Sequence, residues 1–439
     1  MNFNDFQKFQ TSSKIDGNYV GKVNENVIRI IEEKIPDYEF IIKNQNNLPF
    51  LIRSEIVKKD NNKLYVEHPY LKNITYFLEW TPTQKVEAAI SILTLQNKLV
   101  PFGYYLNDPH AFNITFQNAV PVYFDLGSII KGKIIPAYWF IKNFLGMGSK
   151  DYWGFVLKMN KIKVFTTFLI MTIHPEPLTY LEKVVTKSFS HKGFLTKSIF
   201  NVVWRIKKIT TPLHLNKQKL GSIQRFIFKH SNFVTYWTDY NQKNLESVAE
   251  DERTKNITDI IKRINSTKML DIGGNKGAFS KLAIQLGVKE VVCIDLDPTS
   301  LDFLRDDIRK NDLNIWTANM NLLDYNETPA SNKNFLPAHE RLQSEFCICL
   351  ALVHHLCYFS DYTFSQVAFR LNRFCLKTLL IEFIPFDDSH LNGPIYNDKD
   401  KSWYTKENFI LEMQKFFNGD LTIYKSSPSP RILILFNKN

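Results

Sequence analysis

The sequence predicts an α/β protein whose C-terminal part is a mainly parallel sheet covered by helices. From residue 268 onward, short apolar runs alternate with segments of helical periodicity, which is typical of parallel strands joined by helices. The first run leads directly into the glycine-rich loop Gly273–Gly277. Only a Ser-Pro-Ser-Pro turn at 427–430 separates the last two runs, which predicts an antiparallel pair at the end of the chain.

The elements of this C-terminal part follow one another regularly. A strand at 268–272 precedes the loop, and a helix follows it with apolar residues at the spacing of one helical face: Phe279, Leu282, Ala283 and Leu286. Gly287 is placed to end that helix. A second strand at 290–295 is apolar on both faces, and Asp297 with Pro298 predicts the start of the next helix. The remaining apolar runs predict strands at 315–318, 346–352, 379–383, 421–425 and 432–436.

The rest of the chain gives weaker patterns. Residues 1–135 predict an α+β domain, with a helix at 82–98 and two strands, 113–116 and 120–124, joined as a hairpin through 117–119. Residues 136–235 predict a helical, aromatic and basic connector, and the parallel-sheet domain spans 236–439.

The positive charge of the chain is concentrated in the connector. Lys and Arg number 55 against 44 Asp and Glu, a net charge of +11, yet no acidic residue lies between Glu182 and Asp239. The segment Lys183–Lys229 holds eleven basic residues with interleaved aromatic residues. Such a segment could bind an anionic surface, nucleic acid or an acidic substrate as a non-catalytic docking element. The alternative is a helical connector with a lysine-rich outer face.

Composition excludes several classes of protein. The first residues lack the apolar core of a secretory signal, and the longest apolar stretch, 164–173, is shorter than the roughly 20 residues of a membrane span. We therefore expect no transmembrane segment and a cytoplasmic protein. Five cysteines without a C-x-x-C pair predict reduced, buried thiols and no metal site. Oligomeric state does not follow from the sequence.

The strand, loop and second strand predict a site for a nucleoside cofactor. Asp271 directly precedes the glycine loop, and Asp295 ends the second strand 24 residues later. Glycines are required because the backbone must approach the ligand without a Cβ in the way. Asp295 is placed to accept hydrogen bonds from both ribose hydroxyls, and its charge disfavours a 2′-phosphate.

The loop spacing distinguishes between cofactors. The dinucleotide pattern G-x-G-x-x-G is not met, because Asn275 and Ala278 replace its second and third glycines. The loop instead resembles the first motif of class I S-adenosylmethionine (SAM)-dependent methyltransferases, D-x-G-x-G-x-G, with Asp271, Gly273 and Gly277 in place. Asn275 stands at the middle glycine, and asparagine tolerates a left-handed backbone better than other residues with a side chain.

The resemblance extends over most of the chain. Residues 349–356 resemble that family's fourth motif and residues 380–385 its fifth strand. A bacterial subgroup that includes nodulation-type and ribosomal-protein-methyltransferase-like proteins resembles this chain in the run Tyr236–Tyr240 and in the His354-His355 pair. The N-terminal region of that subgroup is similar to Glu79-Trp80 and 108–128 here. This resemblance implies a Rossmann-like, seven-stranded sheet with an antiparallel last strand.

The resemblance also implies a SAM site and its residues. The predicted cofactor cleft is formed by Asp271, Gly273, Gly274, Asn275 and Gly277. Asp295 would bind the ribose with Leu296 beside the adenine, and Asn321 and Leu322 would contact the adenine edge. The family usually has Asp where Asn321 stands, but an amide carbonyl still accepts the adenine amino proton.

The candidate catalytic residues follow the fourth and fifth strands. His354 and His355 are candidates for a general base, because imidazole titrates near neutral pH. The alternative is that both are structural or line the substrate pocket. Glu382 could orient a substrate amine, or could serve as a helix cap or ion-pair partner. The methyl acceptor, whether small molecule, glycan or protein, is not identified by the sequence.

A second constellation lies in the N-terminal domain. Asp108, Asn113 and Asp125 have the spacing of the catalytic and metal loops of kinases, in which one Asp is the base while Asn and the second Asp hold magnesium. Leu106 replaces the usual histidine, and neither a glycine-rich loop nor a Val-Ala-Ile-Lys strand is recognisable. The sequence thus leaves open a kinase-like phosphotransferase, a kinase-like remnant, or two aspartates that cap turns around the hairpin.

Overall fold

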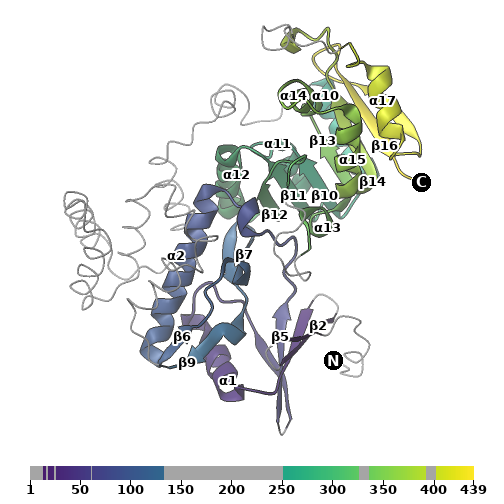
Figure 1. Cartoon of the computed structure of the whole chain (residues 1–439). Helices are drawn as coiled ribbons and strands as arrows, with labels where there is room; N and C mark the ends of the chain where they lie inside the picture. Colours follow the sequence, from purple (N-terminus) through teal and green to yellow (C-terminus); the bar gives the residue numbers. More distant parts are fainter. Residues whose placement is uncertain are drawn as a thin grey trace, which may run out of the picture. The chain divides into compact units, whose positions relative to one another are not determined.

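The computed structural model describes residues 13–15, 18–23, 26–60, 62–132, 251–325, 336–391 and 402–439. The chain forms two compact units (Figure 1): an N-terminal unit of residues 1–72 and 82–224, and a C-terminal unit of residues 73–81 and 225–439. The basic segment Lys183–Lys229 and the run Tyr236–Tyr240 lie outside the described residues. The predicted docking role of the basic segment therefore stays a prediction.

The C-terminal unit is built on a seven-stranded sheet of order β12-β11-β10-β13-β14-β16-β15. Its strands are β10 (Lys268–Ile272), β11 (Glu290–Asp295), β12 (Ile315–Asn319), β13 (Ser344–Cys349), β14 (Cys375–Phe383), β15 (Leu421–Lys425) and β16 (Ile432–Asn437). The first five are parallel, and β16 is antiparallel to both its neighbours, as predicted. The strand order reverses at β10, and open α/β sheets bind ligands at the carboxyl ends of the strands at such a point.

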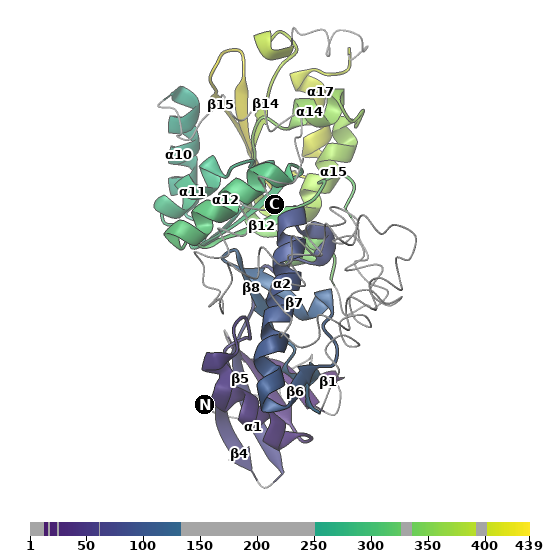
Figure 2. The same ribbon diagram turned by 90° about the vertical axis from the view of Figure 1, so that its left-hand side faces the viewer.

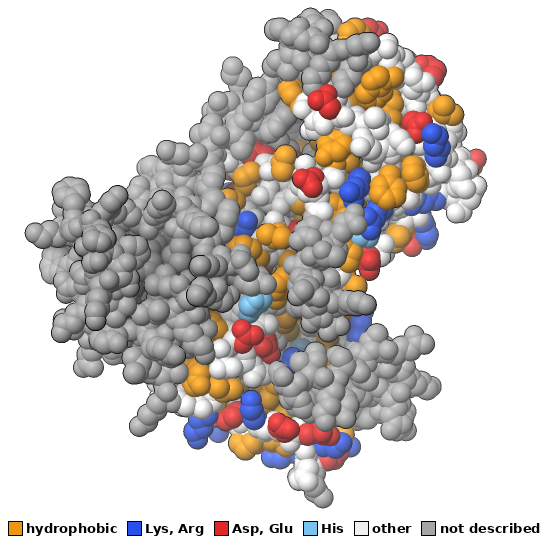
Figure 3. All heavy atoms as spheres, viewed as in Figure 1, with side chains coloured by type: hydrophobic (Ala, Val, Ile, Leu, Met, Phe, Trp, Pro, Cys, Tyr) orange, Lys and Arg blue, Asp and Glu red, His pale blue; other side chains and the backbone are white. Residues whose placement is uncertain are grey.

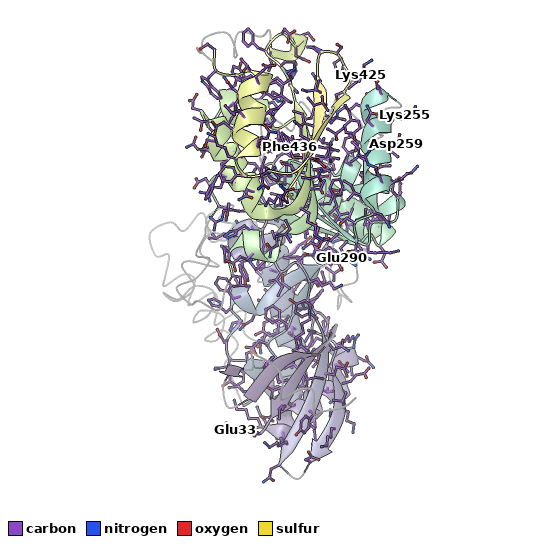
Figure 4. The ribbon with its side chains drawn as sticks, turned by 90° about the vertical axis from the view of Figure 1, so that its right-hand side faces the viewer. Glu33, Lys255, Asp259, Glu290, Lys425 and Phe436 are labelled. Atoms are coloured by element: carbon purple, nitrogen blue, oxygen red, sulfur yellow. The ribbon has the colours of Figure 1, made fainter. Side chains whose placement is uncertain are left out.

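Helices cover both faces of this sheet (Figure 2). One face carries α10, α11 and α12, and the other carries α14, α15 and α17. Their bounds, with the short α13 and η9, are α10 (Glu252–Ile264), α11 (Ala278–Gln285), α12 (Pro298–Asn311), α13 (Ala338–Arg341), α14 (Val353–Tyr358), α15 (Phe364–Phe374), η9 (Ser389–Leu391) and α17 (Lys406–Gln414). Figure 4 shows Lys255 and Asp259 of α10 on the same side as Lys425 of β15, and Asn256 Nδ2 donates to the Lys425 carbonyl at 2.8 Å.

Local signals account for most of these elements. The Asp297 carboxylate accepts from the backbone N–H groups of Thr299 and Ser300 at the start of α12, as the cap prediction required. Gly287 follows α11 with φ +100°. The predicted fourth strand ends earlier than expected, because α14 begins at Val353. All five cysteines are free and buried, which confirms the prediction of reduced, buried thiols.

A short segment before the long N-terminal helix belongs to the C-terminal unit. It contains the turn η3 (Phe77–Glu79) and the fully buried Trp80. The Glu79 carboxylate pairs with Arg341, and Thr81 Oγ1 donates to Asp302 Oδ1 at 2.8 Å. The chain therefore enters the C-terminal unit once before it builds the sheet.

The N-terminal unit contains a five-stranded antiparallel sheet of order β1-β2-β3-β5-β4, with α1 inserted between β3 and β4. Its elements are β1 (Ser13–Ile15), β2 (Asn18–Val23), β3 (Asn26–Ile31), α1 (Ile35–Asn44), η2 (Gln45–Asn47), β4 (Glu55–Asp60), β5 (Lys63–Pro69), α2 (Pro82–Leu99), η4 (Val100–Phe102), β6 (Tyr104–Leu106), η5 (Ala111–Asn113), β7 (Ile114–Gln117), β8 (Val120–Tyr123), η6 (Leu126–Ser128) and β9 (Ile129–Lys131). The predicted helix and hairpin correspond to α2 and to β7 with β8. Asn118 and Ala119 both have positive φ, as a tight two-residue hairpin turn requires.

The described helices and the described surface can be compared with the predictions from composition. No helix among the described residues combines the length and apolar character needed to cross a membrane. On the face shown in Figure 3, acidic and basic side chains are interspersed over the described residues.

Candidate functional site

The loop after β10 has the backbone that its sequence predicts. Gly273, Asn275 and Gly277 have φ values of +75°, +53° and +69°, so asparagine adopts the left-handed conformation at the middle glycine position. The N–H groups of Gly273 and Gly274 both donate to the Ile294 carbonyl, at 2.8 and 3.2 Å. The loop is therefore held against the end of β11.

Side chains would not fit at two positions of this loop. A Cβ on Gly274 would lie 2.6 Å from Cys293 Sγ and 2.7 Å from Asp271 Cγ. A Cβ on Gly277 would lie 2.6 Å from Leu304 Cδ1. Close packing therefore requires glycine at both positions, apart from any ligand.

Asp271 lies buried directly beneath the loop. Its carboxylate accepts a hydrogen bond from Ser280 Oγ at 2.6 Å. Burial raises the pKa of Asp271 to about 6, which the Ser280 bond opposes and the nearby Asp295 charge reinforces. Asp271 and Asp295 lie near the carboxyl ends of the neighbouring parallel strands β10 and β11, so both carboxylates are at the same edge of the sheet.

Asp295 joins the loop to β11. Its Oδ2 accepts from the Asn275 N–H at 2.8 Å and its Oδ1 from the Asp297 N–H at 2.7 Å. Burial raises the pKa of Asp295 to about 6, against the opposing effect of these backbone bonds. Each of the two Asp295 oxygens has a second lone pair, so the carboxylate can accept hydrogen bonds from two further hydroxyl groups.

The residues predicted to contact adenine lie in different environments. Leu296 is 60% exposed beside Asp295, and Asn319 Nδ2 donates to its carbonyl at 2.9 Å. Asn321 Oδ1 accepts from the Leu323 N–H at 3.0 Å. The Leu322 side chain is buried in the core, so only the backbone of that residue could reach a base at the surface.

The two predicted histidines lie together at the start of α14. Their ring centroids are 3.8 Å apart; His354 is 1% exposed and His355 is partly buried. Burial lowers the pKa of His354 well below its usual value and that of His355 to about 3. Both rings are therefore neutral near pH 7, and their strength as general bases is reduced.

Glu382 forms a buried ion pair. Arg253 Nε and Nη2 donate to its two oxygens at 2.8 and 2.9 Å, and Ser426 Oγ donates to Oε1 at 2.5 Å. The Glu382 side chain is fully buried. This corrects the suggestion that Glu382 orients a substrate amine and agrees with the alternative ion-pair interpretation.

One histidine near the pair was not predicted. His390, in η9 after β14, has its ring centroid 5.5 Å from that of His354. Its backbone N–H donates to Asp388 Oδ1 at 2.8 Å, and Asp388 pairs with Arg431. The only sequence signal was a lone histidine shortly after the fifth strand.

In the N-terminal unit, the three kinase-like residues surround the β7–β8 hairpin. Asn113 Nδ2 and Tyr123 Oη both donate to the Asp108 carbonyl, at 2.9 and 3.0 Å. Asp125 Oδ1 accepts from the Gly127 N–H at 3.1 Å. Each aspartate thus takes part in a turn around the hairpin, as one alternative predicted.

Two further residues of this unit were not predicted. A Cβ on Gly127 would lie 3.1 Å from Tyr38 Oη and 3.6 Å from Arg29 Nη1. Arg29 lies on β3 and Tyr38 on α1, and Arg29 Nη1 is 3.5 Å from Tyr38 Oη. A basic residue on the third strand thus lies close to the Asp125–Gly127 turn.

Comparison with known proteins gave one sequence relative and several structures. No protein-family profile matches the chain. Among solved structures, the methyltransferase domain of bacterial CtHen1 is 12% identical, with a TM-score of 0.32 over 42% of this chain and 96% of that one. The bifunctional kinase-methyltransferase WbdD is 15% identical, with a TM-score of 0.30 over 42% of this chain and 38% of that one.

The sequence relative is the nodulation protein NoeA of Rhizobium meliloti (strain 1021). It is 22% identical over 399 residues, which cover 80% of this chain and 77% of NoeA. The chain is therefore a distant relative of a nodulation protein over most of its length, which confirms the nodulation-type resemblance predicted from the sequence.

Proposed function

We propose that the C-terminal unit is a class I methyltransferase that uses SAM. The observation that carries this proposal is the bond between the Asn275 N–H and Asp295 Oδ2. It joins the left-handed glycine loop, which follows β10 where the order of the sheet reverses, to the acidic end of the neighbouring strand β11, and this is the position for a nucleoside cofactor.

The residues around this loop fit such a cofactor. SAM would supply an activated methyl group on a sulfonium sulfur. In our proposal the glycine loop and Asp271 line the amino-acid end, and Asp295 accepts from the two ribose hydroxyls. Leu296 flanks the adenine, whose edge meets Asn321 and the backbone of Leu322. By fixing the cofactor, these groups supply the near-attack geometry that lowers the barrier to transfer.

The direct test is isothermal titration of the full chain with S-adenosylhomocysteine (SAH), followed by incubation of bacterial extracts with labelled SAM. Binding with one site per chain, together with labelled product, would support the proposal. The absence of any heat of binding would contradict it. The class of the labelled product, small molecule, glycan or protein, would identify the acceptor.

The affinity for SAM is expected to fall by about five- to tenfold when the pH drops from 7.5 to 5.5. Asp271 and Asp295 both have pKa values raised to about 6, so they are mostly ionised at the higher pH and mostly protonated at the lower. A cationic ligand binds the ionised form better. The measurement is isothermal titration with SAM across this range. Asp271→Asn should show a shallower dependence, and equal affinity at both pH values would contradict the expectation.

A second candidate function, a kinase-like phosphotransferase, concerns the N-terminal unit. The observation that favours it is Arg29 on the third strand beside the Asp125–Gly127 turn, since kinases place a basic third-strand residue and a metal-binding Asp at the nucleotide phosphates. Asn113 and Asp125 would hold magnesium, and Asp108 would serve as the base.

Titration with ATP tests this candidate. Binding is expected to require Mg²⁺ and to be lost in Asp125→Ala, because that carboxylate would hold the metal. Asp108→Asn is the matched control, since a base is not needed for binding. ATP binding that is independent of Mg²⁺, or no binding at all, would rule this candidate out.

A further inference from the structure

Three histidines come together beside the proposed cofactor site, although the cysteine pattern predicted no metal. His354 and His355 start α14, and His390 lies in η9 after β14. One ring nitrogen of each lies within 4.8 Å of the others. The ring centroid of His390 is 5.5 Å from that of His354 and 6.3 Å from that of His355. Two separate elements thus direct imidazole groups to one point.

His354 gives a second, independent indication of a ligand. Its side chain is 1% exposed, and neither ring nitrogen has a hydrogen-bond partner among the described residues. A buried polar group without a partner costs about 1–3 kcal/mol and is rare in folded proteins. An ion bound between the three rings would provide the missing partner.

The charges around the cluster are compatible with a cation. Arg431 is a cation whose charge acts on His354 and His390, and its Nε lies 2.8 Å from Asp388 Oδ2. Asp388 thus offsets the charge of Arg431, and it lies two residues before His390 and accepts a hydrogen bond from the His390 N–H. Nitrogen ligands of this kind suit zinc and its neighbours among the transition metals, not magnesium or calcium.

We propose that His354, His355 and His390 bind one transition-metal ion, and that the ion is Zn²⁺. Tetrahedral zinc with nitrogen ligands at about 2.0–2.1 Å requires nitrogen atoms about 3.4 Å apart. In the structure the three atoms lie within 4.8 Å of one another, so metal binding would draw the rings closer together. Three protein ligands leave a fourth position open, which is typical of catalytic rather than structural zinc.

The cluster lies at the same edge of the sheet as the glycine loop. β10 and β13 are parallel neighbours, so the loop and α14 both follow carboxyl ends at that edge. A Cβ on Gly273 would lie 3.0 Å from Leu352 Cδ2, and Leu352 directly precedes α14. In our proposal the zinc site and the cofactor loop therefore lie at the same edge of the sheet.

This position suggests the class of acceptor, an inference that rests on the proposed methyltransferase function. Zinc would bind a hydroxyl group of the acceptor and lower its pKa, so that the proton leaves to water. The oxygen would then form the bond to the methyl carbon while the bond from that carbon to sulfur breaks, its electron pair remaining on sulfur. The products are a methyl ether and SAH.

The test uses the full chain without a histidine tag. After removal of metal, the chain is loaded with Zn²⁺, dialysed, and analysed by elemental mass spectrometry; Co²⁺ loading reports the geometry through its visible spectrum. We expect one zinc per chain and an intense tetrahedral cobalt spectrum. We expect a weaker affinity for zinc in both His355→Ala and His390→Ala. Loss of a residue that only hydrogen-bonds to a metal ligand lowers the affinity by about 10–100-fold, and loss of a ligand itself should lower it further. His339→Gln, in the same unit but outside the cluster, should bind as wild type does.

The outcomes separate the site from the function. The proposed site would be overturned if the wild-type chain did not retain zinc. It would also be overturned if both cluster variants retained as much zinc as the wild type. Tighter binding of Mn²⁺ than of Zn²⁺ would overturn the choice of metal. Titration of the variants with SAH checks that they fold. Titration of the wild-type chain with SAH tests the proposed function separately. If the wild type binds zinc but not SAH, the metal site is supported and the methyltransferase function is contradicted. Loss of methyl transfer in His390→Ala with unchanged SAH affinity would support the role in acceptor activation, and unchanged transfer would overturn that role.

Discussion

Replacement of Arg253 by methionine is expected to lower the free energy of unfolding by about 3–5 kcal/mol, because it leaves the buried charge of Glu382 without its partner. Both nitrogen-to-oxygen distances in this pair are below 3 Å, and Glu382 is fully buried. Methionine retains much of the apolar stem of arginine, so the change removes mainly the charge. The measurement is a urea titration of the full chain followed by circular dichroism.

Two controls isolate the ion pair. The double variant Arg253→Met with Glu382→Met removes both charges and should recover most of the lost stability, because a buried pair is often replaced by apolar groups at little cost. Lys377→Met breaks the exposed pair with Glu345 and should change the unfolding free energy by less than about 1 kcal/mol. A loss below about 1 kcal/mol in Arg253→Met alone would contradict the structural role given to Glu382.

The parts of the fold that the sequence predicted are those set by short-range rules. Apolar runs, Gly287 after its helix, and the Asp297 cap depend on residues a few positions apart, and each lies where the structure has it. The left-handed Asn275 also followed from a property of one residue type. The predicted strand at 346–352 extends beyond β13, because an apolar run does not distinguish a strand from the helix that follows it.

The parts that the sequence did not predict depend on contacts between distant residues. His390 meets His354 only because β13 and β14 are neighbours in the sheet. The pairing of Glu382 with Arg253 joins residues 129 positions apart. Arg29 and Asp125 are likewise far apart in sequence, and no local pattern marks an arginine on a strand as part of a site. Such contacts require the topology, which a single sequence leaves undetermined.

Replacement of Asp295 by alanine is expected to weaken the binding of SAH by about 100-fold or more. Hydrogen bonds to a charged group contribute about 1.5–3 kcal/mol each, and two ribose hydroxyls would lose their acceptor. Since about 1.4 kcal/mol corresponds to a tenfold change in affinity, the direct loss alone exceeds 100-fold. The Asn275 N–H would also lose its bond to Asp295 Oδ2, which loosens the loop. Isothermal titration of the full chain measures the effect.

Asp297→Ala separates the ribose contact from simple disturbance of the strand end. Asp297 caps α12 through Thr299 and Ser300, and it follows Asp295 by two residues. Its loss should cost about 0.5–2 kcal/mol of stability but change the affinity for SAH only slightly, because no ribose contact is assigned to it. If both variants bound SAH equally weakly, the loss in Asp295→Ala would reflect disturbance of the strand end and not the loss of a ribose contact. If Asp295→Ala bound as tightly as wild type, the cofactor site would not lie at this edge of the sheet.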